Sequence, residues 1–121
     1  MDRQGLRREL CGLPGAVETQ PFGPDVWVYK VGGRMFALVP TTGALGVTIK
    51  LEPPHGQLAR AQYSAVAPGY HMNKEHWNTV QLGGDVPDDV VREWISLSHA
   101  LVVAGLPRRV RSELAPTRAV G

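Results

Sequence analysis

The chain has 121 residues and a formal net charge of +2, and 43% of its residues are hydrophobic. This length suits one domain that buries a core without disulfides or metals, and the hydrophobic content excludes a globally disordered chain. The single cysteine, Cys11, excludes an intrachain disulfide. Neither a signal peptide nor an apolar run of membrane-spanning length is recognisable, so we expect a cytoplasmic protein without membrane contact.

The first predicted element is a short helix that begins after Asp2, a residue suited to capping a helix N-terminus. Leu6, Leu10 and Leu13 are spaced by four and three residues, which places them on one apolar stripe. Two glycines and a proline within 12–15 end this helix.

Three strands are expected next, over 26–31, 34–39 and 45–51. The first two are rich in β-branched and aromatic residues and flank Gly32-Gly33, so they predict a tight antiparallel hairpin whose turn needs positive φ. The third alternates apolar and polar residues with period two, which is typical of a half-buried strand.

The second half of the chain predicts two helices and one strand. Pro53-Pro54 closes the strand meander, and a short helix is expected over 58–66. A strand over 77–82 shows alternation again, and a long helix over 87–104 follows a turn.

The long helix has a defined start and one apolar face. Pro87 suits the first turn, and Asp88 and Asp89 favour the positive end of the helix dipole. Its buried face is expected to hold Val91, Trp94, Ile95, Ser98, Leu101 and Val102. The remaining residues, 108–121, are basic and polar, and we expect a flexible tail there.

The order of these elements predicts an α+β fold in a single domain, 1–107. Helices packed on one face of an antiparallel sheet would form a two-layer sandwich. The other face of the sheet would then stay partly exposed and available for binding.

Candidate binding residues gather in one loop and around the hairpin. The loop contributes Tyr70, His71, Asn73, Lys74, His76 and Trp77. Such a set can bind phosphate, a base or a peptide, and it can equally serve only to tie down its own backbone. Lys30 and Arg34 flank the hairpin turn, and Lys50 completes the candidate set.

The sequence holds no complete catalytic or metal-binding pattern. The histidines form neither an HExxH motif nor a paired Cys/His motif, and no serine lies in a G-x-S-x-G context. We therefore expect no metal and no cofactor, and a binding protein rather than an enzyme. An enzyme that uses His71 or His76 as a general base is the weaker alternative.

Several segments together resemble one family of small bacterial proteins. They are Leu13-Pro14-Gly15-Ala16, Pro21-Phe22-Gly23, Lys30-Val31-Gly32-Gly33-Arg34-Met35-Phe36-Ala37, Ile49-Lys50, and above all Pro68-Gly69-Tyr70-His71-Met72-Asn73-Lys74-Glu75-His76-Trp77. On these segments the chain, from its first helix to about Pro107, resembles the YjbR/MmcQ family. It departs from the family at His99, where a tyrosine is common.

The resemblance implies a frataxin-like (CyaY-like) two-layer fold and a DNA-binding protein with a double-wing arrangement, and it carries over no catalytic residues. Frataxins bind iron through acidic residues on their first helix and a neighbouring strand. Here that helix carries three arginines against Asp2 and Glu9, so iron binding is not expected.

Two hypotheses for the function follow from the sequence and the resemblance. The first is a DNA-binding protein whose phosphate contacts come from Lys30 and Arg34 on the hairpin and from the loop with His71, Asn73 and Lys74. The second is a module for a small ligand or a protein partner that uses the same loop and the exposed sheet face.

Overall fold

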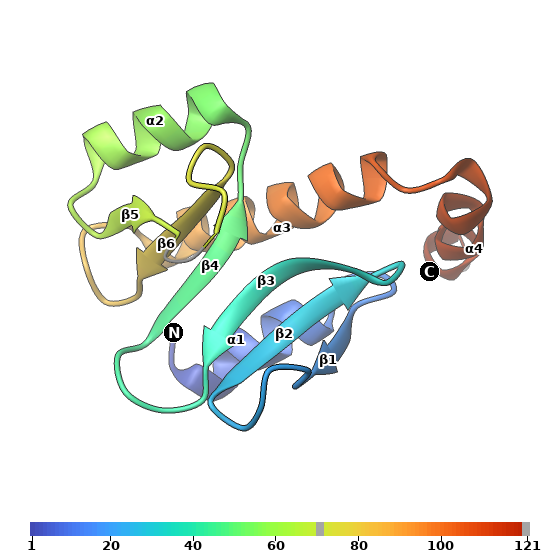
Figure 1. Ribbon diagram of the computed structural model, residues 1–121, viewed down its shortest axis with the longest axis horizontal. Coiled ribbons are helices and arrows are strands. Elements are labelled where there is room, and N and C mark those ends of the chain that lie inside the picture. Colours follow the sequence, from blue (N-terminus) through green and yellow to red (C-terminus); the bar gives the residue numbers. More distant parts are fainter. Residues whose placement is uncertain (70–71, 120–121) are drawn as a thin grey trace.

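The computed structural model describes residues 1–69 and 72–119, with the backbone alone for 115–119. Four helices and six strands lie within these residues (Figure 1). They are α1 (Arg3–Cys11), β1 (Val17–Thr19), β2 (Val26–Val31), β3 (Arg34–Pro40), β4 (Gly46–Lys50), α2 (Pro53–Gln62), β5 (Val66–Pro68), β6 (Trp77–Gln81), α3 (Asp88–Ala104) and α4 (Arg108–Ala119).

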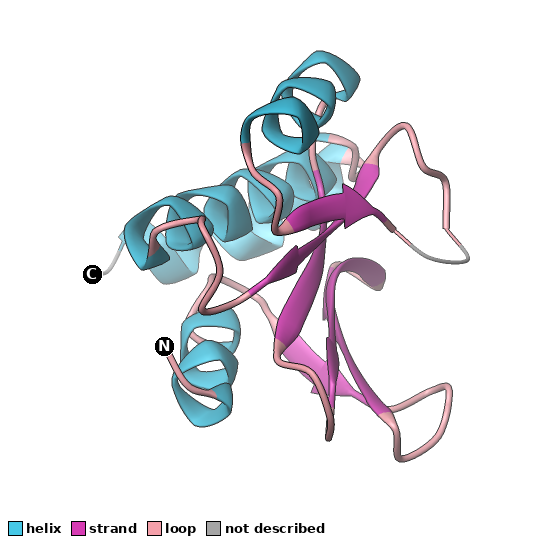
Figure 2. Cartoon of the chain, turned by 90° about the vertical axis from the view of Figure 1, so that its left-hand side faces the viewer, coloured by secondary structure: helices cyan, strands magenta, loops and turns pink. Residues whose placement is uncertain are grey.

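All six strands belong to one antiparallel sheet with the order β1-β2-β3-β4-β6-β5. Helices α1 and α3 lie behind this sheet in Figure 1, and Figure 2 shows the helices gathered on one side of the strands. The predicted α+β fold with an antiparallel sheet is thus confirmed. Within the described residues, no helix combines the length and apolar content needed to cross a membrane.

The hydrophobic core fills the space between the sheet and the helices. Its fully buried members include Leu6 and Leu10 of α1, Val39 and Ile49 of the sheet, and Ile95 of α3. These residues come from the apolar stripe of each helix and from alternate positions of the strands, as the sequence periodicity predicts.

Two local predictions are confirmed at the level of single atoms. The carboxylate of Asp2 accepts a hydrogen bond from the backbone N–H of Gly5 at 2.7 Å, which caps α1. The hairpin between β2 and β3 turns at Gly32 and Gly33, whose φ angles are 58° and 81°. These positive values are the ones that a two-residue hairpin turn requires.

The second helix begins earlier than the sequence predicts. It was expected over 58–66, but α2 starts at Pro53-Pro54 and ends at Gln62. Prolines suit the first turn of a helix, because the N–H groups there have no partner within the helix. Val66 belongs to β5 instead, which, like β1, has three residues and is too short to show a period.

The predicted flexible tail over 108–121 is wrong for most of its length, because residues 108–119 form α4. This helix packs on two glycines with positive φ. A Cβ atom on Gly32 would lie 2.6 Å from Leu106 and 3.0 Å from Val110, and one on Gly15 would clash with Leu114. Positions 120 and 121 of the expected tail fall outside the described residues.

Candidate functional site

The sheet splits between β3 and β4 at the end next to the hairpin. A bulge in the β2–β3 ladder lies at the same place. Tyr29 pairs with Ala37 whereas Lys30 pairs with Met35, which leaves Phe36 as the extra residue of β3. Beyond the bulge β3 and β4 share only two registered pairs. Figure 1 shows the two strands diverging from there, with α3 behind them.

Ser98 of α3 fills the break in the hydrogen-bond ladder. Its hydroxyl donates to the carbonyl oxygen of Phe36 at 2.6 Å and accepts from the backbone N–H of Lys50 at 2.8 Å. The side chain is fully buried. Both backbone groups therefore keep a hydrogen bond that the separated strands cannot give them. Ser98 was predicted on the buried face of its helix, but its hydrogen bonds join residues that are far apart in sequence and could not be predicted.

A groove of about 280 Å³ lies beside this split, and we call it the basic groove. It is lined by Arg34 and Met35 of β3, Lys50 of β4, and Leu101, Val102 and Gly105 of α3. None of these lining residues is acidic, and two carry a positive charge. Arg34 Nη1 donates to the carbonyl oxygen of Gly105 at 3.0 Å, where the guanidinium offsets the negative end of the α3 dipole. The side chains that line the groove therefore carry a net positive charge, which suits an anion.

Strand register places two further candidate residues next to residues that line the basic groove. Lys30 lies opposite Met35, and Trp77 lies opposite Lys50. The residues on both sides of Lys30, and those on both sides of Lys50, are buried in the core. Since side chains alternate along a strand, these two lysines belong to the face away from the helices. The structure therefore brings the predicted site residues Lys30, Arg34, Lys50 and Trp77 to one end of the sheet.

The loop before β6 is held by its own hydrogen bonds. Tyr70 and His71 lie outside the described residues. The side-chain oxygen of Asn73 accepts a hydrogen bond from the backbone N–H of Glu75 at 2.9 Å. The backbone carbonyl oxygen of Asn73 accepts one from the N–H of His76 at 3.3 Å. Asn73 therefore shapes a turn, which favours the alternative in which this loop ties down its own backbone.

Lys74 lies apart from the basic groove and next to α2. Its carbonyl oxygen accepts from Arg60 Nη1 at 3.4 Å, and the same guanidinium also donates to the fully buried side chain of Asn78. The amide nitrogen of Asn78 donates to the carbonyl oxygen of His76 at 3.2 Å. Sequence reasoning missed the Arg60–Asn78 pair, because it joins a helix and a strand that no local pattern connects.

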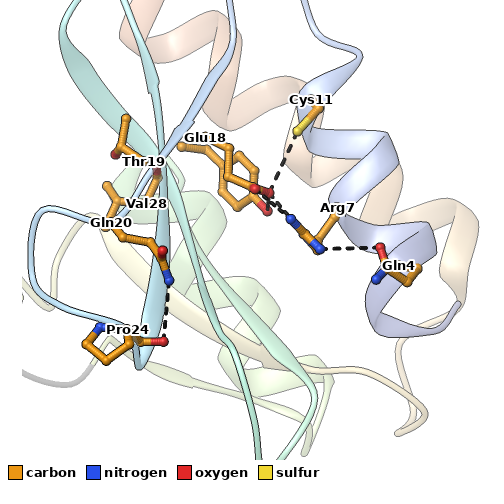
Figure 3. A network of polar contacts seen from close by, with 9 residues as sticks. Gln4, Arg7, Cys11, Glu18, Thr19, Gln20, Pro24 and Val28 are labelled. Atoms are coloured by element: carbon orange, nitrogen blue, oxygen red, sulfur yellow. Dashed lines mark hydrogen bonds and ion pairs between the residues drawn. The ribbon is translucent and has the colours of Figure 1, made fainter.

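A second polar cluster joins α1 to β1 and β2 (Figure 3). Arg7 donates to both carboxylate oxygens of Glu18, at 2.7 and 3.0 Å, and Tyr29 donates to Glu18 at 2.6 Å. The guanidinium of Arg7 also lies 4.0 Å from the centre of the Trp27 ring. Cys11 Sγ lies 3.8 Å from Glu18. This cluster fixes α1 on the edge of the sheet.

The contacts within this cluster shift the pKa values of Glu18, Tyr29 and Cys11. The hydrogen bond from Arg7 holds the pKa of Glu18 below its usual range. Burial, and then the bond to Glu18, raises the pKa of Tyr29. Loss of hydration, and then the Glu18 carboxylate, raises the pKa of the Cys11 thiol. A raised pKa disfavours the thiolate, which is the nucleophilic form of cysteine.

Replacing Glu18 with glutamine should reduce the loss of stability in acid. The pKa of Glu18 is lower in the folded state than in the unfolded chain, where it is about 4.3. Its stabilising contribution is therefore fully present above that value and is lost as the pH falls through the folded-state pKa. Urea denaturation from neutral pH down to about pH 3 should show the gap between wild type and Glu18→Gln narrowing.

The matched control for this experiment is Glu93→Gln, on the exposed side of α3. This variant should follow the wild-type dependence of stability on pH. A constant difference between wild type and Glu18→Gln over the whole range would contradict the role of the Arg7–Glu18 pair.

Comparisons with known proteins agree with this structure. The family model YjbR matches residues 11–101. The chain is 36% identical over 121 residues to the uncharacterised protein YbdF of Escherichia coli O157:H7, covering 96% of this chain and 99% of that protein. It is also 36% identical over 110 residues to the uncharacterised protein YjbR of Escherichia coli K12, with 90% and 93% covered.

Solved structures show the same architecture. The crystal structure of Deinococcus radiodurans protein DR2400, with the family domain DUF419, superposes with a TM-score of 0.83 at 39% identity, covering 93% of this chain and 86% of that chain. A Pseudomonas syringae crystal structure gives a TM-score of 0.72 at 25% identity, with 84% and 98% covered. Both the sequence and the fold thus lead to one conclusion: the chain belongs to the YjbR family.

Proposed function

We propose that this protein binds nucleic acid, DNA in the first place, through phosphate contacts in the basic groove. The observation that carries the proposal is the presence of Arg34 and Lys50 in one groove without an acidic lining residue. Lys30 adds a third cation on the neighbouring strand. Phosphate binding needs several cations close together. Lys30 and Lys50 belong to the sheet face away from the helices, and Arg34 lies beside them at the hairpin end of β3.

Trp77 gives the same surface an aromatic side chain. It lies opposite Lys50 in the β4–β6 ladder and is half-buried. Bases of an unpaired strand can stack on an aromatic ring, whereas the bases of a duplex are already stacked. This arrangement therefore favours single-stranded over double-stranded DNA.

The expected affinity is modest. The net charge of +2 is low for a dedicated DNA-binding protein, so we expect dissociation constants of roughly 10⁻⁴ to 10⁻⁶ M, which are typical of non-specific binding. This proposal includes three further predictions. They are a frataxin-like fold, a cytoplasmic location and the absence of catalysis.

A small anionic ligand is the second candidate for the same groove. The volume of about 280 Å³ lies just below the usual range for ligand pockets, about 300–1,000 Å³. Apolar contacts from Met35, Leu101 and Val102 would pack against the body of such a ligand. A protein partner on the exposed sheet face is the other alternative that the sequence left open.

Reversing the charge of Lys50 should weaken DNA binding about equally for all sequences. The Lys50→Glu variant removes a cation that neutralises a phosphate and adds a repulsion. The slope of log affinity against log salt should become shallower by about one unit for each phosphate that is no longer neutralised. Lys50→Arg should restore binding. Fluorescence anisotropy with single-stranded and duplex DNA at several salt concentrations measures both effects.

The matched control is Arg8→Glu, an exposed residue of α1 in the helix layer that undergoes the same change of charge. It should bind nearly as well as wild type. Equal weakening by Arg8→Glu and Lys50→Glu would mean that net charge, not the groove, governs binding. Absence of binding at low salt would overturn the DNA proposal, and titration with a nucleoside monophosphate would then test the small-ligand alternative.

A further inference from the structure

A second pocket lies between α3, α4 and the turn at Pro14, and we call it the interhelical pocket. Its volume is about 410 Å³, which is within the usual range for small-molecule sites, about 300–1,000 Å³. His99, Val103 and Ala104 of α3 and Arg111 and Leu114 of α4 line it. The basic groove and the interhelical pocket have no lining residue in common.

The contacts of α4 with other elements, and the short side chains of α3, shape the pocket. Helix α4 packs on Gly32 through Val110 and on Gly15 through Leu114. On α3 the positions that face the pocket include Ala100 and Ala104, which are one helical turn apart. Their short side chains leave unfilled space between the two helices.

The polar groups of the pocket are few and basic. His99 Nε2 lies 2.8 Å from the carbonyl oxygen of Pro14. A carbonyl oxygen only accepts, so this nitrogen carries a proton and the ring is held in one orientation. The ring also packs edge-on against Phe36, with 5.2 Å between the ring centres. Arg111 is exposed at the pocket, and no acidic residue is found among the lining residues that the structure describes.

We infer that the interhelical pocket binds a small amphipathic carboxylate. Its apolar body would pack against Val103, Ala104 and Leu114. Its carboxylate would accept two parallel hydrogen bonds from the guanidinium of Arg111, the geometry that favours arginine for this group. The site is independent of the proposed DNA binding, since it lies outside the basic groove.

The test is a titration of ¹⁵N-labelled full-length protein with octanoate, followed by ¹H–¹⁵N correlation spectra. Shifts should gather at the amides of 15–16, 99–104 and 111–114. Arg111→Gln should weaken octanoate binding by about tenfold, since a charge-assisted bidentate pair is removed. Ala104→Phe should abolish binding by filling the pocket, and its spectrum reports whether it is folded.

Two controls distinguish binding in the interhelical pocket from general effects of charge and of hydrophobic contact. Arg109→Gln, an exposed residue of α4 outside the pocket lining, should bind octanoate like wild type. 1-Octanol has the same apolar body without the charge, so it should bind more weakly than octanoate and be unaffected by Arg111→Gln. Equal affinity for octanol and octanoate, equal weakening by Arg109→Gln, or shifts spread over the whole chain would overturn the inference.

Discussion

Truncating Trp94 to alanine should lower the free energy of unfolding by about 3–5 kcal/mol. The Trp94 side chain is 5% exposed and lies on the buried face of α3, as predicted. Its ring makes edge-on contacts with His55 and Tyr63, at 5.8 and 5.7 Å between ring centres. These partners belong to α2 and its C-terminal end, so Trp94 joins two helices to the core.

The reason for this large effect is the weak local support of α2. Its N-terminal cap makes no side-chain hydrogen bond, and Leu58 in its middle is exposed. The helix therefore depends on contacts with other elements, of which Trp94 supplies two aromatic pairs. Removing the indole leaves a cavity that a neighbouring helix cannot fill without moving.

Urea denaturation followed by circular dichroism measures the effect. Leu97→Ala is the matched control, because Leu97 lies on the same helix but is 38% exposed. Its cost should stay near or below about 1 kcal/mol. Similar denaturation midpoints for the two variants would show that the Trp94 contacts contribute little.

The elements that the sequence predicts correctly are those whose signals are local. The Asp2 cap, the leucine stripe of α1 and the glycine turn at Gly32-Gly33 each involve residues within one or two turns of the chain. The hairpin also brings Lys30 and Arg34 close together, so that part of the candidate site was predictable. Helix α4 was not, because its packing partners Gly15 and Gly32 lie far away in sequence.

The rest of the candidate site depends on the register of the sheet. Lys50 of β4 and Arg34 of β3 line one groove beside the split between these strands, and no local residue pattern shows where the pairing of the two strands ends. Asn73 shows the reverse case. Its residue type and its loop suggested a ligand contact, but its side-chain oxygen accepts a hydrogen bond from the backbone N–H of Glu75 within a turn.

Replacing Ser98 with alanine should destabilise the protein and loosen the split in the sheet. Its hydroxyl satisfies the carbonyl of Phe36 and the N–H of Lys50 together. Phe36 is fully buried and Lys50 is half-buried, so alanine leaves both groups without a partner. An unsatisfied buried backbone group costs about 1–3 kcal/mol, and two are affected here.

Ser96→Ala is the matched control, since Ser96 lies two residues earlier on the exposed side of the same helix. Alanine is a better helix former than serine, so this variant should be as stable as wild type or slightly more stable. Hydrogen exchange adds a local readout. The amide of Lys50 should exchange faster in Ser98→Ala than in wild type, whereas the amides of the β2–β3 hairpin should change less.

Ser98→Thr separates the loss of the hydroxyl from a change in packing. Threonine keeps the hydroxyl and adds one methyl group, so it should restore protection of the Lys50 amide even if crowding in the core lowers overall stability. If Ser98→Ala unfolds at the same midpoint as Ser96→Ala and leaves Lys50 exchange unchanged, the serine bridge does not hold the split. The separation of β3 and β4 beside the basic groove would then not depend on the hydrogen bonds from α3.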